Sequence, residues 1–272
     1  MTFVKSLHIY PLKSCRGIDV RAAQLTQTGL AWDRNWMLVD RDGVFISQRE
    51  HPNMALISIA LDANTLQCVA ARMPSMSIAL QDAGRSRRRV YVWEYEGHAF
   101  DEGDAAAEWF SDFLGTHCRL VAFDPAEQRK SDTNWTGANE ALNRFSDGFP
   151  ILIANTASLA ELNARLDAPI PMNRFRPNIV IEGLAPYDED HIDTLSTQSI
   201  VLRIVKPCTR CEITTTDQET GARGVEPLQT LSTYRANPRV QGGITFGQNA
   251  IVTTGFGEQI AIGMPLATGW TF

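Results

Sequence analysis

The stretch "VKPCTRCEITTTDQETG", Val205–Gly221, decides how the rest of the chain is interpreted. It holds two of the five cysteines, Cys208 and Cys211, three residues apart. The segment before the pair, "SIVLRIVKPC", and the segment after it, "CEITTT", are both rich in β-branched residues. Because this composition is typical of strands, we expect the two cysteines to lie between two strands of a largely β fold.

The spacing of Cys208 and Cys211 is open to four interpretations. A thioredoxin-type pair opens a helix, and the strand composition after Cys211 argues against it. A structural zinc site needs four ligands, whereas the other cysteines and the five histidines are scattered. Two interpretations remain: the cysteines are two inert buried thiols, or one of them is a thiolate that holds a soft metal largely coordinated by a bound cofactor. Lys206 and Arg210 would stabilise such a thiolate and attract an anionic ligand.

Length and charge limit the class of protein. The 272 residues are enough for one large domain or two modest ones, and the formal charge of −6 argues against general nucleic-acid binding. No run of about 18 apolar residues predicts a transmembrane helix. The start "MTFVKSLHIYPLKSCRG" lacks the apolar segment of a secretory signal. An odd number of cysteines without a signal favours free thiols in a reducing compartment, so the expected location is cytoplasmic.

The first part of the chain is dominated by short strand-like runs. "NWMLVDRDGVFISQ" is predicted to form a hairpin that turns at Asp42-Gly43. One helix is expected in "DAAAEWFSDFLG", with Asp104 as its N-cap and Gly115 as its stop. Many short strands with few helices predict a mainly β fold with some α structure, that is, a barrel or sandwich with helix packed on it.

A polar segment without a long period runs from Asp124 to about Asp147. A segment of this kind is usually a functional loop or a linker, so it is the best place for a domain seam. The second part then begins with a strand, Ile151–Ala154, followed by a helix in which Ser158 and Glu161 match the capping-box pattern. The segment "NRFSDGFP" in front of that strand is a candidate lining of a pocket.

Polar groups that suit a phosphorylated ligand occur at several turns and strand ends. Arg176 and Asn178 stand at a strand start in "FRPN", and the helix that opens at "NTAS" offers free N–H groups to an anion. The others are Lys13, Ser14 and Arg16 in "PLKSCRG", Arg34 in "WDRNW" and Arg49 in "SQRE". Each of them alone also fits a cap or a surface cation. Together they favour convergence on one anionic ligand that accepts many hydrogen bonds.

Four of these segments together carry a resemblance to a known family. "KPCTRCEITTTDQETG", "FRPNIVIEG", "YPLKSCRG" with "LAWDRNWMLVD", and "FGQN" resemble the MOSC family, in particular its YcbX-like and mitochondrial amidoxime-reducing branch. The motifs occur in matching order, and the resemblance runs from about Val4 to Leu266. It implies a β-barrel MOSC domain, placed here at residues 125–272, and an N-terminal β-rich region at residues 1–124. The first strands are candidates to complete the second barrel.

The resemblance also implies a ligand and its binding residues. The branch binds the molybdenum cofactor, a pterin dithiolene with a phosphate, and holds the metal through the second cysteine of the motif, here Cys211. Cys208 would then be a neighbour of the site. The cofactor-binding residues carried over by motif position are Lys13, Ser14, Arg34, Asn155, Ser158, Arg176, Asn178, Thr209, Arg210 and Asn249. Asp217 is either a proton carrier in catalysis or a turn residue in "TDQETG".

The implied activity is molybdenum-dependent reduction of N-hydroxylated compounds such as hydroxylamines, amidoximes and N-hydroxylated bases. Many bacterial relatives carry a C-terminal ferredoxin domain, but no cysteine follows Cys211 to ligate an iron–sulfur cluster. A separate electron-transfer protein of ferredoxin, flavoprotein or cytochrome type is therefore expected, with no nucleic acid and no membrane as partner. The alternative is a module that binds or delivers the cofactor, or transfers sulfur, without reductase activity.

Overall fold

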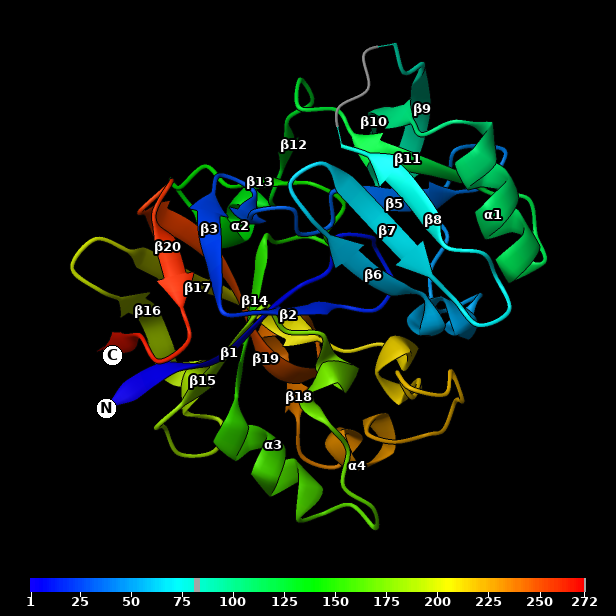
Figure 1. The fold of residues 1–272 in the computed structure, drawn as a ribbon. Helices are drawn as coiled ribbons and strands as arrows, with labels where there is room; N and C mark the ends of the chain where they lie inside the picture. Colours follow the sequence, from blue (N-terminus) through cyan, green and yellow to red (C-terminus); the bar gives the residue numbers. More distant parts are fainter. Residues whose placement is uncertain (81–83, 272) are drawn as a thin grey trace.

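The computed structural model describes residues 1–80 and 84–271 and confirms a mainly β fold with a few helices (Figure 1). Seven strands close into a barrel in the order β14-β15-β1-β21-β16-β17-β19, and β19 returns to pair with β14. The barrel strands are β1 (Thr2–Ile9), β14 (Ile151–Asn155), β15 (Ile179–Glu182), β16 (Ile192–Ser196), β17 (Val201–Thr209), β19 (Gly243–Thr254) and β21 (Pro265–Trp270). The β14–β15 pair is parallel, and the other barrel pairs are antiparallel.

Apolar side chains fill the barrel. Leu7, Ile153, Ile181 and Leu202, from four different strands, belong to one core cluster and have no exposed surface. Closure between β14 and β19 depends on Gly247, which has φ +73° and whose added Cβ would lie 2.6 Å from the Ile153 carbonyl oxygen. A glycine is needed there because the backbone turns in the left-handed region against its neighbour.

The first strand ties the start of the chain into the barrel. β1 lies between β15 and β21, with Thr2 opposite Leu266. Residues 2–9 therefore share a sheet with residues 151–270, and the two ends of the chain lie near each other (Figure 1). The other strands packed around the barrel are β2 (Ile18–Val20), β3 (Ala22–Thr26), β4 (Gly29–Leu30), β18 (Ala236–Asn237) and β20 (Gln259–Ala261). The domain boundary at residue 124 stays a prediction.

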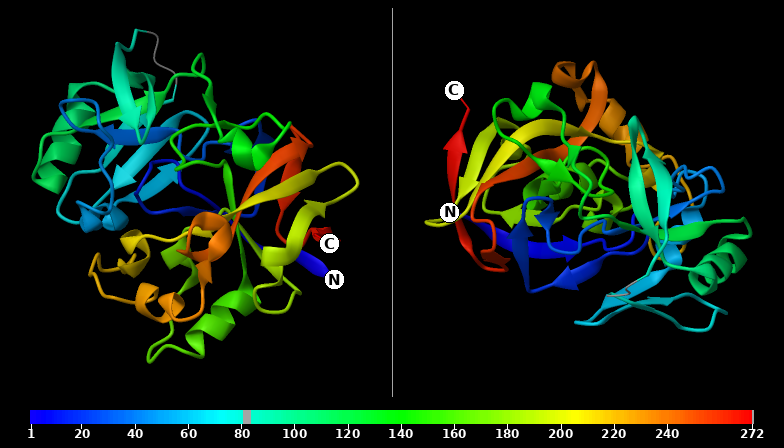
Figure 2. Two further views of the ribbon diagram at one scale, coloured as in Figure 1. Left: turned by 180° about the vertical axis from the view of Figure 1, so that it is seen from behind. Right: turned by 90° about the horizontal axis from the view of Figure 1, so that it is seen from above.

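Two smaller sheets stand beside the barrel (Figure 2). One has the order β5-β11-β10-β9 and the other β6-β7-β8. Their strands are β5 (Trp36–Val39), β6 (Ser58–Leu61), β7 (Thr65–Val69), β8 (Met76–Ala79), β9 (Arg87–Val92), β10 (Tyr95–Asp101) and β11 (Arg119–Phe123). Trp36, Cys68 and Phe110 belong to the core cluster between these sheets and α1 (Asp104–Leu114).

The remaining helices are short. They are α2 (Thr133–Thr136), α3 (Thr156–Asn163), α4 (Leu228–Ser232) and the 3₁₀ turns η1 (Pro52–Leu56), η2 (Met172–Phe175), η3 (Asp188–His191), η4 (Glu212–Thr215) and η5 (Pro238–Val240). None of the helices within residues 1–80 and 84–271 has the length and apolarity that a membrane crossing requires.

Four local expectations need correction. Gly103 caps α1, so Asp104 is its first helical residue, where the carboxylate accepts a hydrogen bond from Arg119. Gly115 ends the helix in the left-handed conformation as predicted. The expected hairpin after Asn35 has only one regular arm, β5, because its second arm is reduced to single bridges such as Val39–Phe45.

The segment "CEITTT" is not a strand. It forms the turn η4, because the hydroxyls of Thr214 and Thr215 bond the carbonyl oxygens of Cys211 and Glu212, three residues earlier. Hydroxyl side chains often compete with a strand ladder in this way. The capping box at Ser158 is also wrong, since the N-cap of α3 is Asn155, three residues earlier, whose side chain accepts the N–H of Ala157.

The polar segment from residue 124 to 147 lies against the barrel and contains the pair β12 (Arg129–Lys130) and β13 (Leu142–Asn143). The buried guanidinium of Arg129 donates hydrogen bonds to the carbonyl oxygens of Arg144, Ser146 and Asp147. These bonds fix the loop 144–147 at the edge of a cleft.

Candidate active site

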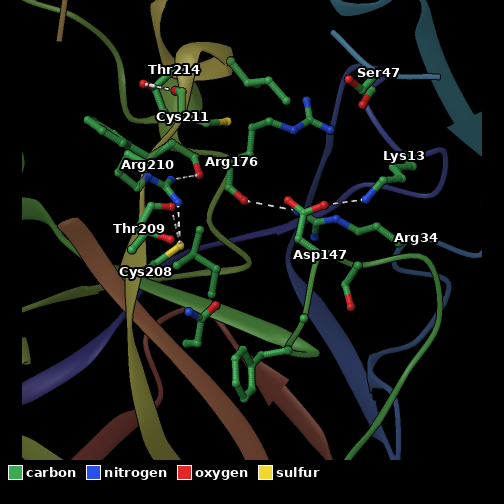
Figure 3. Close-up of a pocket in the computed structure, with 18 of the residues that line it drawn as sticks. Lys13, Arg34, Ser47, Asp147, Arg176, Cys208, Thr209, Arg210, Cys211 and Thr214 are labelled. Atoms are coloured by element: carbon green, nitrogen blue, oxygen red, sulfur yellow. Dashed lines mark hydrogen bonds and ion pairs between the residues drawn. The ribbon is translucent and has the colours of Figure 1, made fainter. Parts of the chain in front are cut away.

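A cleft of about 450 Å³ lies where the barrel meets the N-terminal sheets, within the usual size range of ligand sites, about 300–1,000 Å³ (Figure 3). The end of β17 forms one wall with Cys208 to Cys211, and Lys13, Arg34 and Ser47 face it from the N-terminal part. The lining residues include Lys13, Ser14, Arg34, Ser47, Arg49, Trp93, Ser146, Asp147, Phe149, Arg174, Phe175, Arg176, Asn178, Lys206, Cys208, Thr209, Arg210, Cys211, Thr214 and Asn249.

The cleft is strongly cationic although the whole chain is acidic. Seven lysines and arginines line it, and Asp147 is the one carboxylate among the lining residues that the structure describes. The chain as a whole carries a formal charge of −6. Concentrating positive charge in a concave site focuses the field there, so the site suits an anionic ligand.

Cys211 lies two residues beyond the end of β17 and is the N-cap of η4. Its Sγ atom accepts a hydrogen bond from Nη2 of Arg49 at 3.4 Å, and its carbonyl oxygen accepts one from Thr214 at 2.9 Å. The side chain is partly exposed and lines the cleft. Cys211 therefore presents a thiol to the ligand space beside a cation that complements the negative charge of a thiolate.

Cys208 has a different partner. Nη1 of Arg210 approaches its Sγ to 2.7 Å, and the same guanidinium donates to the carbonyl oxygen of Phe175. Both cysteines are free thiols, and both line the cleft. The pair is thus asymmetric: Cys208 bonds an arginine two residues away, while Cys211 bonds one from the opposite wall.

The other cysteines fit the interpretation of inert core thiols. Cys15, Cys68 and Cys118 are buried. Burial raises the pKa of Cys68 to about 12 and that of Cys118 to about 11. Among the described residues, no three His, Cys, Asp or Glu side chains are grouped as a metal site. A single thiol in a cationic cleft, as at Cys211, is a donor that suits a soft metal already carrying other ligands.

Arg34 and Arg176 form the cationic centre of the cleft. Both guanidinium groups lie over the ring of Tyr10, at 4.2 and 4.3 Å from its centroid. Burial lowers the pKa of Arg176 to about 10, and its Nη2 atom is buried without a hydrogen-bond partner. A desolvated cation with an unused donor is complementary to an anionic oxygen, and this fits the phosphate of a pterin cofactor.

Lys13 is buried at the same end of the cleft. Its Nζ donates to the carbonyl oxygen of Phe145 at 2.8 Å and to the carboxylate of Asp147 at 2.6 Å. Burial lowers the pKa of Lys13, and Asp147 opposes that effect. Desolvation in the cleft raises the pKa of Asp147, but the charge and hydrogen bond of Lys13, together with Arg49 and Trp93, outweigh it, so the pKa lies below its ordinary value. Asp147 is therefore ionised at neutral pH.

Backbone strain gathers at this cleft. Eight non-glycine residues in the described part of the chain have positive φ, and four of them, Ser14, Arg34, Trp93 and Arg176, line the cleft. Such conformations persist only where the surrounding structure enforces them, and they cluster at functional sites.

Most of the residues predicted from sequence meet in this cleft. Lys13, Ser14, Arg34, Arg176, Asn178, Thr209, Arg210, Cys211 and Asn249 all line it. The side chain of Asn178 is already engaged, since its oxygen accepts from the Leu152 N–H and its amide donates to the His8 carbonyl oxygen. Asn178 therefore ties β14 to β1 under the cleft.

Asn155 and Ser158 do not reach the cleft. Both are fully buried and bond the carboxylate of Glu189, with the Ser158 hydroxyl at 2.7 and 2.8 Å from its two oxygens. In the structure their side chains hold the carboxylate of Glu189 beside the start of α3, and their place in the cofactor set stays a prediction. Arg16 also lies outside the lining and bonds Gln218 and Glu219.

Asp217 is a turn residue. Its Oδ1 accepts the backbone N–H groups of Glu219 and Thr220, and its Oδ2 lies 3.2 Å from Arg174. It does not line the cleft, so the alternative of a turn residue describes it better than that of a proton carrier.

Sequence reasoning missed Asp147 and Arg174 as individual site residues. Asp147 had a signal in "NRFSDGFP", the segment expected to line a pocket, and Ser146 to Phe149 do line it. No sequence pattern pointed to Arg174. It lies in η2, and its partner Asp217 is 43 residues later in the chain, so local spacing does not reveal the contact.

The fold and the cleft define a β-barrel protein whose cationic ligand site presents a thiol. Residues 1–117 match the family model described as "MOSC N-terminal beta barrel domain", and residues 141–265 match that of the "MOSC domain". The chain belongs to the MOSC-domain family, on the branch of the amidoxime-reducing components.

Several relatives on that branch cover most of this chain. "Mitochondrial amidoxime-reducing component 1" of Mus musculus is 35% identical over 85% of this chain and 71% of its own length. The protein of the same name from Homo sapiens is 36% identical over 85% of this chain and 72% of its own length. "Mitochondrial amidoxime reducing component 2" of Bos taurus is 35% identical over the same shares.

Proposed function

We propose that this protein is a molybdenum-cofactor-dependent reductase of N-hydroxylated compounds, with Cys211 as the protein ligand of the metal. The observation that carries the proposal is a thiol aimed into a cleft with seven cations, in a chain whose relatives are named for amidoxime reduction. When bound, the cofactor supplies a metal that changes its oxidation state and can thus reduce an N–O bond.

The chain's own residues would hold the cofactor from both walls. Arg176 offers a desolvated donor to its phosphate, and Arg34, which pairs with Asp33, and Lys13 add two further cations. Thr209 and Arg210 lie next to Cys211 and offer donors near the metal end. Fixed donors of this kind orient a cofactor at little reorganisation cost.

Asp147 is suited to recognise the substrate. Its carboxylate is paired with Lys13, lies 3.3 Å from Nε1 of Trp93 and is open to the cleft. Amidoximes and amidines carry N–H groups, which need an acceptor, and Asp147 is the one carboxylate among the described lining residues. Trp93 and Phe149 provide apolar surface beside it.

The reaction also needs an electron source. Reducing an N-hydroxyl group to an amine and water consumes two electrons and two protons, which the substrate does not supply. We therefore include in the proposal a separate electron-transfer protein of ferredoxin, flavoprotein or cytochrome type, and a cytoplasmic location, which fractionation of producing cells would test.

The test compares the two cysteines. Protein from a molybdate-supplied host should contain about one molybdenum per chain and reduce benzamidoxime with a chemical reductant. Cys211→Ser should abolish turnover, whereas Cys208→Ser should retain much of it. Wild-type turnover by Cys211→Ser would refute the ligand assignment. Protein that binds molybdenum and pterin but reduces nothing would instead be a cofactor carrier.

A further inference from the structure

Arg49 is the one cation that reaches the sulfur of Cys211 among the hydrogen bonds of the described residues. It belongs to the N-terminal part, 162 residues earlier in the chain, and its Nη2 lies 3.4 Å from Sγ. Hydrogen bonds to sulfur are normally longer than those to oxygen, so this contact is a direct one. The candidate metal ligand and this arginine thus come from the barrel part and the N-terminal part of the chain, and both line the cleft.

The side chain of Arg49 is held in place. Its guanidinium lies 4.7 Å from the ring centroid of Trp93, and its backbone N–H donates to the hydroxyl of Ser47 at 3.2 Å. Its carbonyl oxygen accepts a hydrogen bond from Arg223, which follows Cys211 on the same loop. The loop that carries the thiol is thereby tied to the backbone of the residue that bonds it.

Among the described residues, Arg49 forms no close ion pair with a carboxylate, although its charge helps to lower the pKa of Asp147. Within the described part of the chain, Arg34 pairs with Asp33, Arg174 with Asp217 and Lys13 with Asp147, whereas Arg49 forms no ion pair. Its hydrogen-bonding capacity therefore remains available to the sulfur. A cation bonded to a thiolate withdraws electron density from it and weakens its donation to a metal.

We propose, on the basis of the function proposed above, that Arg49 is a positioning residue that hydrogen-bonds the metal-ligating sulfur of Cys211 and raises the reduction potential of the bound metal. Hydrogen bonds to ligating sulfur are among the factors that set metal potentials in proteins. The N-terminal part of the chain would in this way tune a metal that the barrel part ligates.

The test measures the metal rather than turnover alone. Arg49→Met keeps the length of the side chain and its packing on Trp93 but removes both donor and charge. Loaded with cofactor, this variant should show a more negative molybdenum midpoint potential and an altered Mo(V) electron paramagnetic resonance spectrum, with turnover reduced about 10–100-fold. Arg49→Lys, which keeps the charge but loses the planar fork, should shift the potential less and in the same direction.

Arg16→Gln is the matched control. Arg16 bonds Gln218 and Glu219 on the same loop without touching either cysteine, so its loss should leave the potential and spectrum as in the wild type. If the Arg49→Met variant does not bind the cofactor, the potential and spectrum of Arg49→Lys test the role of Arg49. A wild-type potential and spectrum in the loaded Arg49 variants would overturn the role of Arg49. Wild-type protein that contains neither molybdenum nor pterin would instead overturn the proposed function.

Discussion

Arg176 carries a buried donor that the protein itself leaves unsatisfied and that a cofactor phosphate would satisfy. Its Nη2 atom is buried without a partner, and an unsatisfied buried donor costs about 1–3 kcal/mol, more for a charged group. Arg176→Met should therefore raise the free energy of unfolding of the cofactor-free protein by about 1 kcal/mol. The same change should lower cofactor retention, because the phosphate loses its desolvated partner. Denaturant unfolding and molybdenum per chain measure the two effects.

Arg89→Met provides the comparison at a surface site. Arg89 is largely exposed and pairs with Glu96 at the surface, so its loss should change the free energy of unfolding by no more than about 0.5 kcal/mol and leave molybdenum per chain unchanged. Unchanged molybdenum content in Arg176→Met would show that Arg176 does not hold the cofactor.

Single residues also show where sequence reasoning ends. The CxxC spacing left Cys208 and Cys211 equivalent, and only the motif resemblance separated them. The physical difference is the arginine at each sulfur: Arg210 is two residues from Cys208, but Arg49 is 162 residues from Cys211. A partner so far along the chain cannot be read from local spacing, although each arginine was recognisable as a cation at a turn.

A buried carboxyl group between η3 and α3 makes the free energy of unfolding depend on pH. Glu189 of η3 is buried against Asn155 and Ser158, and burial raises its pKa to about 6 from 4.5. A folded-state pKa above the unfolded value means that the folded protein holds the proton more tightly. This contribution to stability is present below about pH 4.5 and is lost as the pH rises through about 6.

Glu189→Gln removes that titration. The free energy of unfolding of the wild type relative to this variant should be higher at pH 5 than at pH 7 by about 1–2 kcal/mol. Urea unfolding of both proteins at the two pH values gives the difference. An identical pH dependence in the two proteins would contradict the burial of a titrating carboxyl between these elements.

Helices and strands were predicted correctly where the apolar pattern extends over several turns. The predictions failed where side chains compete with the backbone for hydrogen bonds. α1 has an apolar face and a glycine stop, and both features were visible in sequence. Thr214 and Thr215 have strand propensity, yet their hydroxyls bond backbone carbonyls three residues earlier and make a turn. Ser158 matches a capping motif, but Asn155 caps the helix instead. Where a turn forms and which residue caps a helix depend on tertiary partners such as Glu189, and intrinsic propensities do not include such partners.

At the scale of the whole molecule, the cleft exists only where two parts of the chain meet. Gln48 and Gln218 exchange reciprocal amide hydrogen bonds of 3.1 and 3.0 Å across that junction, and both are buried. The barrel also needs both parts of the chain, because β1, at the start of the sequence, is one of its seven strands. The mainly β class was predictable from strand count, whereas the order of strands around the ring follows from pairings that no local pattern encodes.

This interleaving predicts that the region from residue 125 to 272 does not fold alone. Without β1, the strands β15 and β21 would become open edges, and the apolar side chains that contact Leu7 would face water. Open edges with exposed apolar surface favour aggregation over a cooperative fold.

The fragment should therefore lack a cooperative thermal transition, which the full chain should show by circular dichroism. Co-expression with residues 1–31, which contain β1 to β4, should recover soluble fragment, and a monomeric, cooperatively unfolding 125–272 fragment would contradict the role given to β1.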